Sequence, residues 1–326
     1  MTTQVLLPLE DSVFDRVSAA VRSGLTGRPK SLPPWLLYDE AGSRLFEQIT
    51  GLPEYYLTRV ERSIFLDKAV QILSEAGDGH RLRLVELGAG SAAKTRILLL
   101  AALERQSSVV YEPVDVSASA LEEARERIEN EIPEVQVIPR LMDYTNGFEL
   151  RPTGERERRL VLYIGSSIGN FEPGEAAALL RRIRGRLRPA DTFLLGVDLR
   201  KDSETLHAAY NDSAGVTAAF NLNLLARMNR ELGADFDLEA FAHRAVWNED
   251  ASRIEMHIES QASQSVRIET LDLEINFRKG ETIHTENSYK FTRGAAEAML
   301  SSAGFTAAST WTDPREWFAV CLGRVE

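Results

Sequence analysis

Leu84-Val-Glu-Leu-Gly-Ala-Gly90 is the stretch that decides the fold of this 326-residue chain. Residues 82–87 form a mostly apolar run that predicts a buried strand, and helical spacing follows over residues 92–104. The two glycines between these segments predict a tight turn in which the backbone can come close to a ligand. In a parallel α/β sheet such a turn lies at the carboxyl edge, so the stretch predicts a nucleotide-like ligand there.

Strand-like and helical runs continue to alternate after this stretch, which predicts a doubly wound parallel sheet. The expected strands cover residues 109–114, 135–139, 160–164 and 192–197, and the expected helices cover residues 118–129 and 173–187. A helix over residues 294–303 and strands over residues 306–311 and 317–324 are expected to complete this sheet.

The pattern changes after Asp198, where one or two helices up to Leu232 precede alternating segments. These segments, residues 253–258, 265–271 and 282–289, predict a small α+β insertion. Before the first strand, helical spacing covers residues 11–25 and 59–76. The paired prolines Pro33 and Pro34 lie between these two helices and predict an extended connector without helix.

Composition excludes several classes of function. The net charge is −11 and no cluster of lysine and arginine is dense enough to offset it locally, which disfavours nucleic-acid binding. The longest apolar run, residues 97–103, is too short to span a membrane, so we expect a cytoplasmic protein with no membrane partner. The single Cys321 excludes an intrachain disulfide, and the five histidines lack the spacing of metal ligands, so no metal is expected.

An acidic residue, Glu86, precedes Gly88 by two positions. This arrangement is typical of class I methyltransferases, where the acid helps to orient the loop and the cationic methionine end of S-adenosylmethionine (SAM). Gly88, Gly90 and Ala93 also satisfy the dinucleotide fingerprint, so an NAD-dependent dehydrogenase is the alternative.

Further acidic residues follow the next two expected strands. Asp115 ends the second strand, where a carboxylate can accept hydrogen bonds from both ribose hydroxyls. Asp143 and Tyr144 follow the third strand and suit an adenine, with the carboxylate accepting from the exocyclic amine and the ring packing on the base.

Longer segments resemble the L-histidine Nα-methyltransferase family of ergothioneine biosynthesis over nearly the whole chain. The matching segments are Lys30-Ser-Leu-Pro-Pro34, Tyr38-Asp39, Gly42-Ser43, Leu45-Phe46, Leu52-Pro-Glu-Tyr-Tyr56, Val85-Glu-Leu-Gly88, Gly165-Ser166, Ile168-Gly-Asn170, Ala214-Gly-Val-Thr-Ala-Ala-Phe-Asn221, Asp235-Phe-Asp-Leu238, Arg253-Ile-Glu-Met256, and the run through Glu286, Ser288, Lys290 and Phe291. The resemblance implies up to three methyl transfers from SAM to the α-amino nitrogen of L-histidine, giving trimethylhistidine (hercynine) and S-adenosylhomocysteine.

The resemblance also implies two domains, and we expect a monomer. Residues 60–199 and 291–326 would form the class I, Rossmann-like SAM-binding domain, and residues 1–59 and 200–290 an α+β substrate-binding domain. With Glu86 and Gly90 from the glycine turn, the implied cofactor contacts are Tyr38, Gly88, Lys94, Asp115, Asp143 and Tyr144. The family often has phenylalanine at the position of Tyr144, which keeps the packing role.

The substrate residues implied by the resemblance suit a zwitterionic amino acid. Tyr55, Asn170 and Tyr210 would bind the carboxylate, Met256, Glu286 and Ser288 would surround the imidazole, and Phe46 and Gly165 would line the space around the amine. Tyr38 is the expected catalytic residue at the amine, by hydrogen bond and then by cation–π contact. The alternatives are another amino acid such as tryptophan, which the charge of Glu286 opposes, and a binding protein without catalysis.

Overall fold

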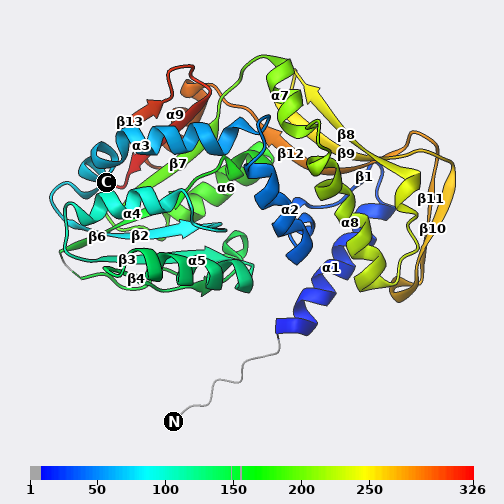
Figure 1. Cartoon of the computed structure of the whole chain (residues 1–326), viewed down its shortest axis with the longest axis horizontal. Coiled ribbons are helices and arrows are strands. Elements are labelled where there is room, and N and C mark those ends of the chain that lie inside the picture. The colour runs from blue at the N-terminus through cyan, green and yellow to red at the C-terminus, as the bar shows by residue number, and fades with distance from the viewer. Residues whose placement is uncertain (1–8, 148, 155) are drawn as a thin grey trace, which may run out of the picture. The chain divides into compact units, whose positions relative to one another are not determined.

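The structure, a computed structural model, describes residues 9–147, 149–154 and 156–326 (Figure 1). It divides into two compact units. The first contains the described residues up to Tyr55 together with Ser203–Asn287, and the second contains Tyr56–Asp202 and Ser288–Glu326. No helix among the described residues is both long enough and apolar enough to cross a membrane.

The second unit is built on a large sheet. Its strands are β2 (Arg81–Leu87), β3 (Val109–Asp115), β4 (Val135–Val137), β5 (Arg140–Leu141), β6 (Glu157–Tyr163), β7 (Thr192–Asp198), β13 (Thr306–Thr312) and β14 (Phe318–Arg324). They run in the order β13-β14-β7-β6-β2-β3-β4, and β5 pairs with β3. The pairs from β7 to β4 are parallel, and β14 is antiparallel to both β7 and β13. The predicted doubly wound, Rossmann-like sheet is therefore confirmed.

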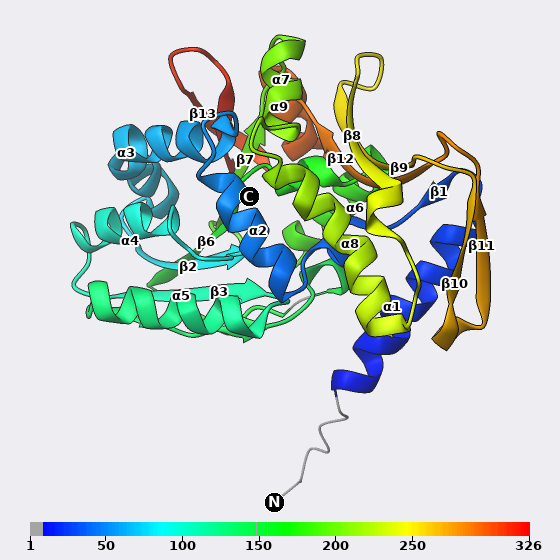
Figure 2. The same cartoon turned by 45° about the vertical axis from the view of Figure 1, so that its right-hand side comes forward.

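Helices cover both faces of this sheet (Figures 1 and 2). They are α3 (Tyr56–Gly77), α4 (Thr95–Leu103), α5 (Ala118–Glu131), α6 (Pro173–Arg184) and α9 (Arg293–Ser302). α6 and α9 bury Leu179, Leu180 and Leu300 in one apolar core with strand residues that include Cys321. The chain order reverses between β2 and β6, and in such sheets ligands bind beyond the carboxyl ends of the strands at this switch point.

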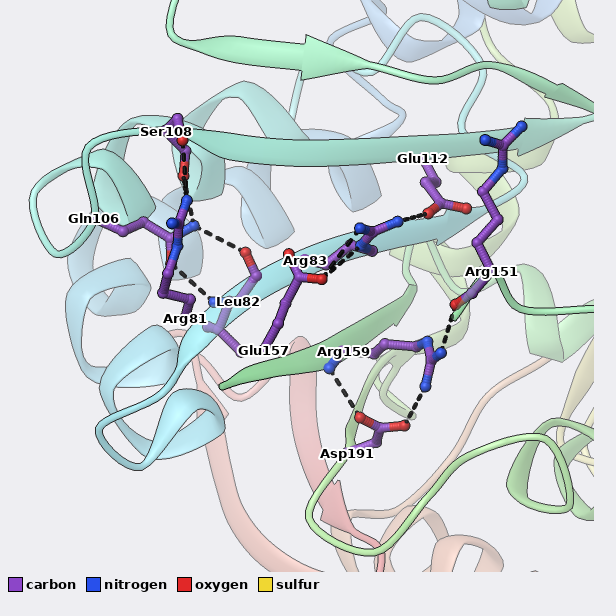
Figure 3. A network of polar contacts seen from close by, with 10 residues as sticks. All are labelled: Arg81, Leu82, Arg83, Gln106, Ser108, Glu112, Arg151, Glu157, Arg159 and Asp191. Carbon is purple, nitrogen blue, oxygen red and sulfur yellow. Dashed lines mark hydrogen bonds and ion pairs between the residues drawn. The ribbon is translucent and has the colours of Figure 1, made fainter. Parts of the chain in front are cut away.

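Buried and partly buried ion pairs lie toward the amino ends of β2 and β6 (Figure 3). Arg83 pairs with Glu112 at 2.7 Å and with Glu157 at 3.1 Å. Arg159, which is only 2% exposed, pairs with Asp191 at 2.9 Å. Buried charges are tolerated when they are paired in this way, so these contacts hold the strand ends opposite the glycine turn.

The second unit continues across the insertion. Phe291 N donates to Asp198 O at 2.9 Å, and Arg200 N donates to Phe291 O at 2.8 Å. The insertion therefore begins and ends at neighbouring positions, because the residues after β7 are hydrogen-bonded to Phe291, where the chain returns.

The first unit contains helices and two small sheets. Its elements are α1 (Leu9–Thr26), β1 (Lys30–Ser31), the 3₁₀ helix η1 (Pro34–Leu37), α2 (Glu40–Thr50), α7 (Ser203–Tyr210), α8 (Val216–Leu232), β8 (Phe241–Asn248), β9 (Arg253–Ser260), β10 (Gln264–Ile268), β11 (Leu273–Phe277) and β12 (Thr282–Tyr289), whose last residues belong to the second unit. One sheet has the order β1-β12-β9-β8, and β10 pairs with β11.

Two local predictions were wrong, and two strands were missed. Pro34 does not exclude helix but begins η1, because proline suits the first helical position, where its missing N–H has no partner to lose. Helix α4 begins at Thr95, since Ala92 adopts a positive φ of 52° in the preceding turn. Strands β8 and β11 were not predicted at all.

Candidate active site

The turn after β2 has the backbone that its glycines require. Gly88 and Gly90 have φ values of +71° and +50°, a region that side chains rarely adopt. Gly88 N donates to Val114 O at 2.8 Å, which holds the turn against β3. A Cβ at Gly88 would lie 3.4 Å from the Tyr144 hydroxyl, so Tyr144 packs directly on this turn.

Asp115 connects the glycine turn to the end of β3. One carboxylate oxygen accepts from Gly90 N at 3.0 Å, and the other accepts from Ser117 N at 3.0 Å. The side chain stays partly exposed. Because each carboxylate oxygen can accept more than one hydrogen bond, this arrangement fits the two hydroxyls of a ribose.

Asp143 and Tyr144 begin the 3₁₀ helix η2 (Tyr144–Asn146), which Asp143 caps through Thr145 N at 3.0 Å. The Tyr144 ring lies edge-on to Tyr163 at a centroid distance of 5.7 Å. Burial raises the pKa of Tyr144 to about 12, so its hydroxyl stays protonated at neutral pH. Gly88 and Tyr144 therefore meet at the carboxyl edge of the sheet, and the chemistry of this set fits an adenosine.

Glu86 lies beneath the glycine turn and is almost fully buried. Its carboxylate accepts from Thr95 Oγ1 at 2.7 Å and from the Tyr111 hydroxyl. Burial raises the pKa of Glu86 to about 7. The acid thus connects β2 to the first residue of α4 across the turn.

Lys94, at the start of α4, forms an ion pair with Glu61 of α3. The Glu61 carboxylate also accepts from Gly165 N, at 2.9 Å and 3.0 Å from its two oxygens. Gly165 follows β6, and the 3₁₀ helix η3 (Ser167–Asn170) comes next and ends at Asn170. Two residues predicted to contact different ligands, Lys94 and Gly165, therefore share one buried carboxylate.

The first unit gathers aromatic rings from distant parts of the chain. Tyr38 lies 5.5 Å from both Phe46 and Phe220, and Phe46 lies 5.9 Å from Phe220, as centroid distances. Tyr55 extends the group, at 6.3 Å from Phe46 and 6.2 Å from Tyr210. We call these five residues the aromatic cluster. It contains Tyr38, Phe46, Tyr55 and Tyr210, which were predicted as site residues, and Phe220, which was not.

Asp39, the residue after Tyr38, links α2 to α8. Its carboxylate caps α2 through Gly42 N at 2.7 Å and accepts from Asn223 Nδ2 of α8 at 2.8 Å. A Cβ at Gly42 would lie only 1.8 Å from Leu37 O, so this position has no room for a side chain. The matching segments Tyr38-Asp39 and Gly42-Ser43 therefore join α2 to α8 beside the aromatic cluster.

The three residues predicted around the imidazole lie on neighbouring strands. Met256 is buried on β9, and Thr285 of β12 donates to Met256 O at 3.0 Å. Glu286 and Ser288 are two apart on β12, so their side chains leave the same face of the strand. Ser288 Oγ accepts from Lys290 Nζ at 2.9 Å, and Lys290 pairs with Asp198 at 2.7 Å.

Asn170 lies close to the end of β12 within the second unit. A Cβ at the preceding Gly169 would be 2.9 Å from Tyr289 O, so η3 packs tightly on the backbone next to Ser288. The structure thus brings Asn170 near one of the predicted imidazole residues.

Comparison with known proteins identifies the family. A model of the histidine-specific, SAM-dependent methyltransferases matches residues 17–325. The chain is 45% identical to histidine N-alpha-methyltransferase of Mycolicibacterium smegmatis over 312 residues, which is 96% of each chain. The chain belongs to the histidine-specific methyltransferase family.

More distant relatives of this methyltransferase carry other names. Ergothioneine biosynthesis protein 1 of Neurospora crassa is 32% identical over 89% of this chain and 32% of its own length. L-tryptophan methyltransferase of Psilocybe serbica is 26% identical over 93% of this chain and 91% of its own. Relatives of this methyltransferase are thus named for two different aromatic amino acids.

Glu61 was not predicted from the sequence of this methyltransferase. The signal was present, because Glu61 falls four residues after Leu57 and four before Phe65, at a buried position of α3. An acid on an apolar helix face is costly unless it has a partner, so such a residue points to a buried polar contact.

Proposed function

We propose that this chain transfers methyl groups from SAM to the α-amino nitrogen of L-histidine. Up to three transfers would give trimethylhistidine (hercynine) and S-adenosylhomocysteine, as a step of ergothioneine biosynthesis. The observation that carries the proposal is the 45% identity to histidine N-alpha-methyltransferase over 96% of both chains. We further propose that the enzyme is cytoplasmic and that the transfer needs no metal, since the methyl group of a sulfonium is already electrophilic.

We assign cofactor binding to the second unit. SAM supplies an electrophilic methyl group on a sulfonium. Gly88 and Gly90 admit the cofactor to the switch point, Asp115 accepts from the ribose, and Asp143 and Tyr144 receive the adenine. Glu86 holds the turn in place through Thr95, and Lys94 meets the amino-acid end.

From the family resemblance we assign Tyr38, Phe46, Tyr55 and Tyr210 of the first unit, and Gly165 and Asn170 of the second unit, to the amine and carboxylate of the substrate. Tyr55, Tyr210 and Asn170 offer neutral donors to the carboxylate. Tyr38 contacts the amine by hydrogen bond while the amine still carries protons. As methyl groups accumulate, the rings of Tyr38 and Phe46 stabilise the cation through their faces. The protein then acts by alignment and charge stabilisation, without a covalent intermediate.

The imidazole is assigned to Glu286, Ser288 and Met256. Lys290 Nζ donates to Ser288 Oγ at 2.9 Å. We assign Ser288 as the donor to one ring nitrogen and Glu286 as the acceptor of the N–H on the other. A neutral imidazole has one donor and one acceptor, which matches this pair.

Turnover with a panel of amino acids tests the proposal. Purified protein, SAM and each amino acid are incubated, and mass spectrometry detects addition of one, two or three methyl groups. We expect histidine to be methylated and tryptophan to be at least tenfold poorer in kcat/KM, roughly 1.4 kcal/mol, since burying Glu286 beside an indole is costly. Methylation of tryptophan in preference to histidine would favour the other amino acid named among the relatives.

A further inference from the structure

Glu61, which the proposed assignment does not use, lies at the centre of a polar group with Lys94 and Gly165. The residue is on α3 and has an exposed fraction of 0%. It accepts from Gly165 N with both oxygens, and Oε2 also accepts from the ammonium of Lys94, whose side chain is 20% exposed. The carboxylate of Glu61 is thus fully buried and bonded to protein groups, whereas the Lys94 side chain is partly exposed.

Glycines make the space that this group occupies. A Cβ at Gly196 of β7 would lie 2.2 Å from Glu61 Oε1, so no larger residue fits there while Glu61 keeps its position. A Cβ at Gly165 would lie 3.2 Å from Lys94 Nζ. The backbone therefore leaves room for both the carboxylate and the ammonium.

The two partners of Glu61 come from loops on either side of the switch point. Lys94 follows the glycine turn after β2, and Gly165 follows β6, the neighbouring strand. The ammonium of lysine has three donors, and Glu61 accepts from one of them. The remaining donors can meet an anionic ligand group at the carboxyl edge of the sheet.

We propose that Glu61 is a positioning residue for the amino-acid end of the cofactor, holding the ammonium of Lys94 where it binds the methionine carboxylate. The inference rests on the proposed function, since it takes SAM as the cofactor. Without Glu61, the half-buried ammonium of Lys94 has no counter-charge to hold it and moves toward solvent. The cofactor carboxylate then loses its fixed partner, and the Gly165 amide loses its acceptor.

Three ligands and three variants test this role by calorimetric titration. S-adenosylhomocysteine has the complete amino-acid end, S-adenosyl-3-thiopropylamine lacks only the carboxylate, and 5′-methylthioadenosine lacks the whole end. The variants are Glu61→Leu, Glu61→Gln and Lys94→Met. Asp67→Asn, an exposed acid on the same helix, is the matched control.

We expect Glu61→Leu and Lys94→Met to weaken S-adenosylhomocysteine binding about tenfold or more, as for loss of a charged hydrogen bond. Glu61→Gln keeps a neutral carbonyl acceptor, so it should weaken S-adenosylhomocysteine binding less than Glu61→Leu does. The two ligands without the carboxylate should bind all variants as they bind the unchanged protein. The double variant Glu61→Leu/Lys94→Met should be no weaker than the single ones, because both act through one contact.

Three results would overturn the role of Glu61. In the first, Glu61→Leu binds S-adenosylhomocysteine at least as tightly as the unchanged protein does. In the second, Glu61→Leu binds all three ligands more weakly by the same factor, which indicates a general structural effect. In the third, Glu61→Leu weakens the thiopropylamine ligand but Lys94→Met does not, and Glu61 then binds the cofactor ammonium itself. If Glu61→Leu does not fold, the same comparison of the three ligands is made with Glu61→Gln and Lys94→Met, and it decides whether Glu61 has this role. Failure of the unchanged protein to bind S-adenosylhomocysteine would instead contradict the proposed function.

Discussion

The hydroxyl of Tyr111 on β3 donates a hydrogen bond to the carboxylate of Glu86 on the adjacent strand β2, and both side chains are buried. Thr95 donates to the same Glu86 oxygen from the first residue of α4. Burial raises the pKa of Glu86 to about 7 although both contacts favour the charged form. The acid that orients the glycine turn is therefore also a group that titrates near neutral pH.

Glu86→Gln should change how stability depends on pH. Between the ordinary glutamate pKa and about 7, the folded protein keeps a proton that the unfolded chain has lost, so stability falls as pH rises. The glutamine side chain does not titrate in this pH range, so the variant lacks this pH dependence. Relative to the variant, the unchanged protein should lose up to about 3 kcal/mol of unfolding free energy as pH rises to about 8. Urea unfolding of both proteins at several pH values measures this, with the exposed Glu123→Gln as control, and parallel pH profiles would contradict it.

Asp115→Ala should weaken binding of S-adenosylhomocysteine at least about tenfold, since each charged hydrogen bond contributes roughly 1.5–3 kcal/mol. Asp115→Asn should weaken binding of S-adenosylhomocysteine less than Asp115→Ala does, because its amide oxygen can still accept from Gly90 N or Ser117 N. Calorimetric titration gives the dissociation constants, and circular dichroism checks the fold. An unchanged constant for the alanine variant would remove Asp115 from the site.

Gly42→Ala should destabilise the first unit. The new Cβ would overlap Leu37 O, and overpacking of this kind costs about 1–3 kcal/mol or more. Gly51→Ala, at the other end of α2, is the matched control, since its Cβ would meet Gln48 O at an ordinary 3.5 Å. Denaturant unfolding compares the two, and equal stability would show that the turn before α2 adapts easily.

Glu286→Ala, especially combined with Met256→Val, should reduce histidine methylation and admit larger aromatic amino acids. Removing the carboxylate leaves an imidazole nitrogen without its acceptor, a loss of about 1–3 kcal/mol. No carboxylate then has to be desolvated against an indole. The measurement is the ratio of kcat/KM for histidine to that for tryptophan in folded protein. A constant ratio would mean that Glu286 does not read the side chain.

Methylation should become faster from neutral to mildly alkaline pH, because only the neutral amine attacks. A peptide α-amine has a pKa of about 7.7–8.0, and that of a free amino acid is higher. Initial rates at saturating SAM, over about pH 6 to 9, test this. A flat profile with methyl transfer shown to be rate-limiting would be incompatible with the proposed chemistry.

Local signals made the sheet predictable from the sequence. β2 and its glycine turn combine an apolar run with two positive-φ residues, and both signals lie within a few neighbouring positions. β8 was not predicted because His243 and Arg244 interrupt its alternation, so its hydrophobic period is weak. Pro34 was misjudged because the same ring that breaks a helix interior is accepted at its first residue.

The Glu61 contacts could not be read from local patterns. Glu61 meets Lys94 33 positions away and Gly165 104 positions away, so only the fold brings them together. The aromatic cluster is similar, since Phe220 lies on α8, far in sequence from Tyr38 and Phe46. The resemblance named most of these rings, but their mutual distances come from the structure.

The hydrogen bonds of Phe291 with Asp198 and Arg200 bear on how this family can diversify. An inserted segment whose two ends meet can be lengthened, shortened or exchanged without moving the strands that flank it. Mutations can then accumulate in residues 201–290 while the nucleotide-binding sheet is inherited unchanged. A lineage that acquires a new amino-acid substrate by this route keeps its methyl donor, which suits the occurrence of relatives named for histidine and for tryptophan.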